Sequence, residues 1–362
     1  MIYIIYLVFF FMILRFVVTL FNFVSDPQLR RVNRQYNQLV SVLIPARNEE
    51  GNIIDLLNSI KNQDYTEYEV IVYDDGSTDN TYTLCLDFSK TDRRFSVIKG
   101  NDLPQGWLGK NHACHQMATL AKGEYLLFLD ADEKIYDGLI NSAIHRMLLN
   151  RLSLLSLFAN QTMQTLGEWS VVPLMHFILL NLLPLRLVFL IKNTSVAAAS
   201  GQFMFFNATE YKKHQWHKKV KNKVVEDVEI MRLVKSTGLN GEALLANGMV
   251  TCRMYKNFTE GINGFSKNFL AAFNYSIPGF LVFLFLLIGG PFLVAFTTDP
   301  SLLFFMIGLI ILTRIMISLM AGQNVFYNVV LHPLQMLGLV LISVFAIQRH
   351  LTKSNTWKGR RV

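Results

Sequence analysis

Long runs of apolar residues lie at both ends of the chain, on either side of a middle region of mixed polarity. Residues 1–24 are almost entirely apolar, with Arg15 and Asn22 as the strongly polar members. Such a run is long enough to cross a hydrocarbon core of about 30 Å. Three further apolar segments cover residues 277–296, 302–320 and 325–347, separated by short polar turns. We expect an N-terminal transmembrane anchor over residues 1–24 and a C-terminal transmembrane bundle over residues 276–348.

The alternative for the first segment is a cleaved signal peptide. A signal peptide has a charged start, a shorter apolar stretch and a cleavage site of small residues. This segment begins Met-Ile-Tyr-Ile-Ile and ends Phe-Val-Ser-Asp, so the pattern favours an uncleaved anchor.

In the middle region, residues 25–275, short apolar runs alternate with stretches of helical periodicity. Strands are predicted over residues 40–44, 70–73 and 125–129, and helices over residues 53–60 and 78–88. Repeated strand–helix units form an open, mostly parallel, Rossmann-like sheet whose ligands bind at the carboxyl ends of the strands. The sequence therefore predicts one α/β domain.

Polar motifs follow three of the predicted strands. They are Pro45-Ala46-Arg47-Asn48-Glu49-Glu50, Asp74-Asp75-Gly76-Ser77 and Asp130-Ala131-Asp132. Two spaced aspartates on their own often lie in a solvated turn. Three strands of one sheet that each end in an acidic or polar motif indicate a binding site. Carboxylates held together repel one another, which favours a divalent cation and the nucleotide diphosphate that it carries. We expect an enzyme that uses a nucleotide-sugar.

Composition and charge add a location. Hydrophobic residues make up 52% of the chain, with 28 Phe, and the net charge is +8. Arg30, Arg31 and Arg34 follow the first apolar segment, which predicts a cytoplasmic central domain by the positive-inside rule. The 3 cysteines show no pairing pattern typical of an oxidising compartment.

The basic tail, residues 349–362, conflicts with three simple crossings after a cytoplasmic domain, because it would then lie outside. One segment is therefore expected to be re-entrant or to lie in the membrane interface. His332-Pro333 makes the last segment the weakest span.

A further apolar stretch, residues 171–191, contains Pro173 and Pro184 and lies within the polar middle region. We expect an interfacial element that opens toward a lipid acceptor. A buried helix kinked by proline is the alternative.

The motifs IPARNEE, DDGSTD, GWLGKNHAC, FLDAD and VVEDVEI occur in an order and spacing that resemble glycosyltransferase family 2, which has the GT-A fold. The resemblance covers about residues 38–270. Its last part is similar to the membrane-associated branch that glycosylates hopanoids, carotenoids or other lipids. The chain lacks the Gln-x-x-Arg-Trp segment of processive polysaccharide synthases, which favours transfer of a single sugar.

The resemblance implies a role for each motif. The residues implied in nucleotide-sugar binding are Pro45, Ala46, Arg47, Glu49, Asp74, Asp75, Lys110 and Asp130. Asp132, with Asp130, is implied to hold Mg²⁺ or Mn²⁺, and Asp227 to act as the catalytic base. The residues placed near the donor sugar or the acceptor are Gly201, Gln202, Glu226 and Arg253.

Structural alternatives accompany these roles. Residues 74–79 also suit a turn and helix cap, with Ser77 or Thr78 as the cap and Asp79 in the first turn. Lys110 also suits a solvated surface position, and Glu226-Asp227 also suits an acidic helix start.

A lysine-rich run carries much of the positive charge. Its members are Lys212, Lys213, His214, His217, Lys218, Lys219, Lys221 and Lys223. We interpret it as a surface that docks on anionic lipid rather than as a solvated loop or a nucleic-acid site. A zinc site at His112, Cys114 and His115 is disfavoured because a fourth ligand is lacking.

The expected protein is a multi-pass, cytoplasm-facing, inverting transferase. It moves one sugar from a UDP-sugar, with UDP-glucose as the first candidate, to a carotenoid or other isoprenoid lipid. The alternatives are a glycerolipid or polyprenyl-phosphate acceptor and a catalytically silent membrane scaffold.

Overall fold

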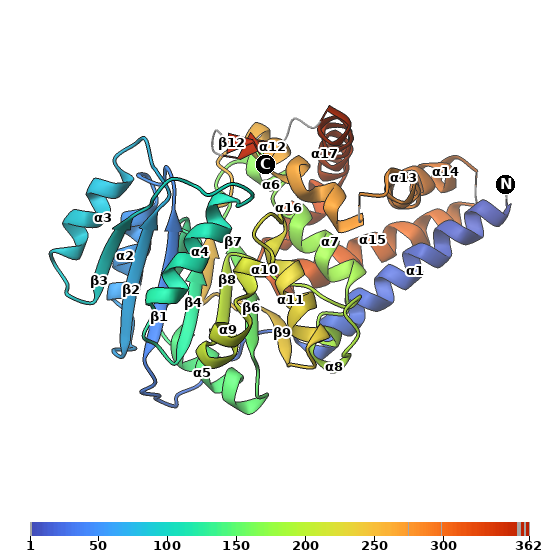
Figure 1. Ribbon diagram of the computed structural model, residues 1–362. Coiled ribbons are helices and arrows are strands. Elements are labelled where there is room, and N and C mark those ends of the chain that lie inside the picture. The colour runs from blue at the N-terminus through green and yellow to red at the C-terminus, as the bar shows by residue number, and fades with distance from the viewer. Residues whose placement is uncertain (1, 274, 298, 353–355, 358–359, 362) are drawn as a thin grey trace.

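A mostly parallel sheet forms the centre of the protein. The computed structural model describes residues 2–273, 275–297, 299–352, 356–357 and 360–361 (Figure 1). The sheet has seven strands in the order β3-β2-β1-β4-β8-β6-β9. Their bounds are β1 Val40–Ala46, β2 Tyr68–Asp74, β3 Phe95–Lys99, β4 Tyr125–Leu129, β6 Leu154–Phe158, β8 Phe203–Asn207 and β9 Gly241–Leu245. Only β8 runs antiparallel to its neighbours, β4 and β6. The predicted α/β class is confirmed.

A three-stranded sheet lies beside the main one. It consists of β5 (Glu133–Ile135), β10 (Val250–Cys252) and β7 (Asn160–Gln161), in that order. The strands β11 (Thr356–Trp357) and β12 (Arg360–Arg361) pair near the C-terminus. Two lysines of the predicted basic tail, Lys353 and Lys358, lie outside the described residues.

Helices cover the main sheet and continue into an extended apolar arm (Figure 1). Those of the middle region are α2 Ile53–Lys61, α3 Thr81–Ser89, α4 Gly109–Leu120, α5 Leu139–Leu149, α6 Leu166–Trp169, α7 Leu174–Leu182, α8 Leu187–Leu190, α9 Ala208–His214, α10 Trp216–Lys219, α11 Glu226–Ser236 and α12 Phe258–Asn268. Those of the ends are α1 Ile2–Ser25, the 3₁₀ turn η1 Phe269–Phe273, α13 Ile277–Leu284, the π turn η2 Phe285–Gly289, α14 Gly290–Thr297, α15 Pro300–Ala321, α16 Val325–Val330 and α17 His332–Thr352.

The main sheet is buried on both faces. Successive residues of β1 point to opposite cores: Leu43 joins one cluster, while Val42 and Ile44 join the other. This is why the predicted strands read as continuous apolar runs rather than as alternating ones. The core that contains Leu43 also includes residues of α17, such as Leu339 and Ile342. The seven-stranded sheet and the C-terminal helices therefore share one hydrophobic core.

The helix predicted over residues 78–88 begins later than expected, at Thr81. The side chain of Asp79 accepts from the Thr81 amide at 3.0 Å, whereas the Thr78 amide donates to Asn48 Oδ1 at 2.8 Å. Ser77 Oγ accepts from the Asn48 amide at 3.0 Å. Ser77 and Thr78 are thus tied to the neighbouring loop and do not cap the helix.

In the part of the chain that the structure describes, four helices are long and apolar enough to cross a membrane: α1, the combined helix over Ile277–Phe296, α15 and α17. The segment expected to be continuous over residues 325–347 is in fact divided into α16 and α17. Pro333 lies in the first turn of α17, where its missing N–H costs no helical hydrogen bond. His332-Pro333, which was expected inside the weakest span, is therefore the start of a helix.

Residues 171–191 form two short helices rather than one. Pro173 precedes α7, and Pro184 lies between α7 and α8. The buried Asn22 of α1 donates to the carbonyls of Leu180 and Leu183, both at 2.8 Å. The first apolar helix is thereby fastened to the end of α7, where the polypeptide turns.

Candidate active site

The loops after β1 and β2 are joined to each other at the carboxyl edge of the sheet. The register places Ala46 beside Asp74. The Arg47 guanidinium donates to the carbonyls of Asp75 and Gly76, the latter at 3.1 Å. These bonds hold the two loops as one wall, as expected for parallel strands that end together.

Lys110 lies at the centre of the acidic residues. Its Nζ is 2.7 Å from Asp130 Oδ1 and 3.2 Å from Glu226 Oε1. It comes from the first turn of α4, which Gly109 begins. Burial would lower the pKa of the Lys110 ammonium, but Asp130 and Glu226 together raise it well above its ordinary value. The lysine is therefore a fixed positive charge and not the solvated side chain that was the alternative.

Asp227 is held by two backbone amides. Its Oδ2 accepts from Gly201 at 2.9 Å, and its Oδ1 accepts from Val228 at 2.8 Å. Burial first, and then the neighbouring Glu226 carboxylate, raise the pKa of Asp227 to about 7. A carboxyl that titrates near neutral pH is suited to accept and release a proton.

A side chain at Gly201 would crowd the charged ends of Lys110 and Glu226. A β-carbon there would lie 2.9 Å from Lys110 Nζ and 3.2 Å from Glu226 Oε1. The next residue, Gln202, accepts through its backbone carbonyl from the Asp130 amide at 3.3 Å. The Gln202 side chain is buried and accepts from Ser200 Oγ at 3.3 Å. The loop thus connects the Asp130 strand end to the Asp227 helix start.

Asp132 lies against two residues that the sequence did not single out, Glu133 and Cys252. One ligand atom from each of the three residues falls within a 4.8 Å group. Cys252 Sγ donates to Asp132 Oδ2 at 3.6 Å, and both oxygens of Glu133 lack a partner among the described residues. Burial, then Asp130 and Glu49, raise the pKa of Asp132 to about 6. The position of Glu133 directly after the Asp130-Ala131-Asp132 motif was the sequence feature that could have identified it as a site residue.

These donors fit a hard divalent cation. Asp132 and Glu133 offer carboxylate oxygens, which Mg²⁺ and Mn²⁺ prefer, and the two oxygens of Glu133 without a hydrogen-bond partner leave acceptor capacity at the site. Asp130 lies outside this group, paired with Lys110, and the third member of the group is the Cys252 thiol. The disfavoured zinc set, His112, Cys114 and His115, does not form such a group among the described residues. Trp107 instead stacks on His115, with ring centroids 5.3 Å apart.

Two predicted site residues do not reach the cavity that the others line. Asp74 is buried beneath the loop, where its Oδ2 accepts from the Ser77 amide at 3.3 Å. Arg253 is paired with the buried Glu168, with Nη2 2.8 Å from Oε1. The next two residues, Met254 and Tyr255, line the cavity instead. The Glu168 pair explains the difference, since a buried carboxylate needs a cationic partner.

The remaining predicted residues line one cavity of about 640 Å³. Part of its lining comes from the loops after β1, β2 and β4, with Lys110, Asp132 and Asp227. Another part comes from apolar side chains of α7, α12, η1 and α17. They are Leu174, Met175, Ile178, Leu179, Phe265, Phe269, Ala272, Leu339 and Ile342. Charged and apolar side chains therefore line the same cavity as Asp227.

Comparisons with known proteins agree with this arrangement. Residues 41–214 match the model of Glycosyl transferase family 2. The 4,4'-diaponeurosporenoate glycosyltransferase of Staphylococcus haemolyticus is 27% identical over 242 residues, covering 64% of this chain and 61% of that protein. The GalNAc(5)-diNAcBac-PP-undecaprenol beta-1,3-glucosyltransferase of Campylobacter jejuni is 32% identical over 108 residues, covering 30% of this chain and 34% of that protein. The alignments thus span less than two thirds of either relative.

One solved structure resembles the whole chain. The mannosyltransferase PcManGT from Pyrobaculum calidifontis, determined in complex with GDP-Man and Mn²⁺, superposes with a TM-score of 0.57 at 14% identity. It covers 97% of this chain and 100% of its own. At that identity the likeness concerns the fold.

Proposed function

From the premise that this chain carries a glycosyltransferase family 2 domain with the GT-A fold, we propose that it transfers a single sugar from a UDP-sugar to a membrane lipid. The observation that carries the proposal is that one cavity is lined both by charged side chains at the carboxyl edge of the sheet and by apolar side chains of α7, α12, η1 and α17. We take the charged lining as its acidic end and the apolar lining as its apolar end. A water-soluble donor and a lipid acceptor require such opposite surroundings within reach of one base.

The donor's nucleoside would lie against the joined loops after β1 and β2. Pro45, Ala46 and Arg47 line this end, together with Glu49 and Asp75. A carboxylate such as Asp75 accepts from ribose hydroxyls or a base N–H. UDP-glucose is the first donor to test, as the resemblance implies.

Lys110 would bind the donor's diphosphate. Its ammonium is already fixed between Asp130 and Glu226, so a phosphate oxygen gains a compact charge without reordering the side chain. Asp130 and Asp132 would hold Mg²⁺ or Mn²⁺, which supplies further neutralisation of the leaving diphosphate.

Asp227 would act as the base of an inverting transfer. The acceptor oxygen forms a bond to the anomeric carbon as the bond from that carbon to the diphosphate oxygen breaks. The acceptor proton passes to the Asp227 carboxylate, and UDP leaves with the bonding electrons. The amides of Gly201 and Val228 hold the carboxylate in place for this step. A carboxylate acceptor has no proton to lose, and Asp227 would then orient it.

The acceptor would enter along the apolar end, between α7 and α17. The relatives' names specify 4,4'-diaponeurosporenoate and an undecaprenol-linked saccharide as acceptors. An isoprenoid of the carotenoid type is therefore the first candidate, and polyprenyl phosphate and glycerolipids follow. The four apolar helices support membrane association, and we place the domain on the cytoplasmic side.

The test is UDP release by the purified full chain with Mg²⁺ or Mn²⁺, a panel of UDP-sugars and isoprenoid, polyprenyl-phosphate or glycerolipid acceptors. We expect release to need both a lipid and a divalent ion, and to be lost in Asp227→Asn. Absence of turnover and of UDP binding would contradict the transferase proposal and favour the silent scaffold.

A further inference from the structure

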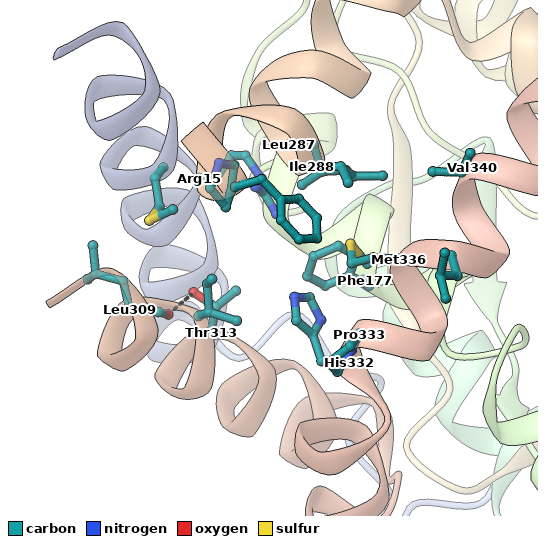
Figure 2. Close-up of a pocket in the computed structure, with 15 residues that line it drawn as sticks. Arg15, Phe177, Leu287, Ile288, Leu309, Thr313, His332, Pro333, Met336 and Val340 are labelled. Carbon is teal, nitrogen blue, oxygen red and sulfur yellow. Dashed lines mark hydrogen bonds between the residues drawn. The ribbon is translucent and has the colours of Figure 1, made fainter. Parts of the chain in front are cut away.

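A second cavity lies among the apolar helices, apart from the candidate active site (Figure 2). Its volume is about 330 Å³, and its walls come from α1, α7, η2, α14, α15 and α17. Almost all lining side chains are apolar, among them Leu287, Leu309, Met336 and Val340. Phe292 and Leu337, at its rim, are 64% and 62% exposed, so the cavity opens on the surface that would face lipid.

Two arginines bring positive charge to this apolar place. Arg15 of α1 lines the cavity, and its guanidinium carbon lies 5.3 Å from the centre of the Phe177 ring (Figure 2). Arg314 of α15 is 1% exposed, and its guanidinium carbon lies 4.5 Å from the same ring. Phe177 is itself part of the cavity wall. Both charges therefore converge on one aromatic side chain.

Neither guanidinium is paired with a carboxylate in the described part of the chain. Arg15 donates to the neutral Asn181 Oδ1 at 3.3 Å, and Arg314 donates to the Asn328 carbonyl at 3.1 Å. Arg314 Nη2 is buried without any hydrogen-bond partner among those residues. The remaining ionisable group at the cavity, His332, adds no negative charge.

Two cations with no anion are costly in surroundings of low dielectric constant. Buried charges in proteins and in membranes are paired or hydrogen-bonded, because the desolvation penalty is otherwise not offset. An anion with apolar chains satisfies both parts of the site: its charge pairs with the arginines, and its chains cover Leu309 and the other apolar walls. A small hydrated anion would leave those walls uncovered.

We propose that this cavity binds a membrane glycerophospholipid with a net negative headgroup, with its phosphate at Arg15 and near Arg314 and its acyl chains along α14 and α15. The occupant is a resident lipid and not the acceptor. The active-site cavity uses other residues of the same helices: Met175 and Ile178 of α7 face it, whereas Phe177 faces the lipid cavity. α7 and α17 thus form a wall shared by the two cavities.

The experiment is native mass spectrometry of the full chain released from nanodiscs that contain equal amounts of phosphatidylglycerol and phosphatidylcholine. We expect selective retention of phosphatidylglycerol. Arg15→Gln should lower that retention by about tenfold, since the variant loses the charge-assisted hydrogen bond to the lipid phosphate. The control is Arg30→Gln, which removes an exposed arginine just after α1 and should leave retention unchanged.

Equal retention of the two lipids, or undiminished retention by Arg15→Gln, would overturn the proposal. A second variant, Val340→Trp, keeps both arginines but fills the cavity from α17, and it should also lower retention. This variant decides the matter if Arg15→Gln does not fold. If the retained lipid gains a sugar when donor is added, the cavity holds the acceptor, and a resident phospholipid is excluded.

Discussion

At the scale of single residues, the hydrogen atom that serves as the side chain of Gly201 sets the geometry of the candidate site. Its amide donates to Asp227, and its α-carbon leaves room for the Lys110 ammonium. The sequence indicated Gly201 through resemblance alone. The reason for a glycine is visible only when β8 and the starts of α4 and α11 come together, because these elements lie far apart in the chain.

We predict that Gly201→Ala reduces transfer by at least tenfold while the protein stays folded. The added methyl group would lie 2.9 Å from Lys110 Nζ and displace it from Asp130 and Glu226. The measurement is kcat/KM for the donor beside the unfolding temperature. Gly308→Ala is the matched control, because nothing lies within 4 Å of a β-carbon at Gly308. Full activity of Gly201→Ala would show that the close fit is unimportant.

Asp227 should determine the pH dependence of transfer. Because its pKa is raised to about 7, kcat/KM should rise with pH to a plateau, with a midpoint near 7 in the free enzyme. Asp227→Asn should lower kcat by about 10²–10⁴-fold and abolish that limb. A kcat/KM that does not change between about pH 5 and pH 9, the range in which such a group titrates, would count against Asp227 as the base.

The same carboxyl affects stability with the opposite trend. The folded state holds the Asp227 proton more tightly than the unfolded state, so this group stabilises the fold at low pH. That contribution is lost as the pH rises from the ordinary carboxyl value to about 7. Denaturant unfolding of the wild-type chain should show this decline, and Asp227→Asn should reduce it. An identical pH profile for the two proteins would contradict the raised pKa.

At the scale of elements, the strands were the most predictable part of the chain. The runs at residues 40–44, 70–73 and 125–129 lie within β1, β2 and β4, because burial on both faces leaves an unbroken apolar signal. The start of α3 was not predictable, since Ser77 and Thr78 bond to a loop from another strand. Tertiary contacts of this kind decide between equivalent capping residues.

The same limit applies to the site. Asp130, Asp132 and Asp227 line one cavity. The strand-end position of Asp130 and Asp132 indicated a site, whereas Asp227 was singled out only through the family resemblance. The ion pair between Arg253 and Glu168 was not predictable from the sequence. Glu168 lies in α6, far from Arg253 in the chain, and the two residues meet only in the folded protein. Glu133 was missed because it lies on β5, a strand of three residues. The alternation of buried and exposed side chains over three residues is too short to reveal a buried carboxyl group.

We predict that α7 sets the affinity for the acceptor. Ile178→Ala should raise KM for the lipid severalfold and leave KM for the donor unchanged, because Ile178 belongs to the apolar part of the cavity lining that α7 contributes. Leu182→Ala is the control, since Leu182 lies on the same helix, is 37% exposed and does not line the cavity. Equal effects of the two variants on lipid KM would place the acceptor elsewhere.

At the scale of the whole molecule, α1 and α15 extend away from the middle region, residues 25–275, whereas α17 stays beside it (Figure 1). Near its start, Gln335 Nε2 donates to the Trp169 carbonyl at 2.8 Å. Near its end, Arg349 Nη1 donates to the Asn263 carbonyl at 2.7 Å. Both partners belong to the middle region. We infer that α17 lies along that region in the membrane interface, which returns the basic tail to the side of the domain and removes the conflict with the positive-inside rule.

The prediction is that single cysteines at Arg30 and Leu351 react with an impermeant maleimide from the same side of sealed vesicles. A cysteine at Ser301, in the first turn of α15, should react from the opposite side. The native cysteines are buried, so they give a low background. Labelling of Leu351→Cys and Arg30→Cys from opposite sides would show that α17 crosses the membrane.

The central claim is that sugar passes from a nucleotide at the acidic end of one cavity to a lipid at its apolar end. The most direct measurement uses UDP-[¹³C]glucose and the full chain in nanodiscs with an isoprenoid acceptor, followed by mass spectrometry and NMR of the extracted lipid. We predict a lipid heavier by one labelled hexose, with the anomeric configuration opposite to that of the donor, and none with Asp227→Asn. A retained configuration, or label that reaches only water, would contradict the account.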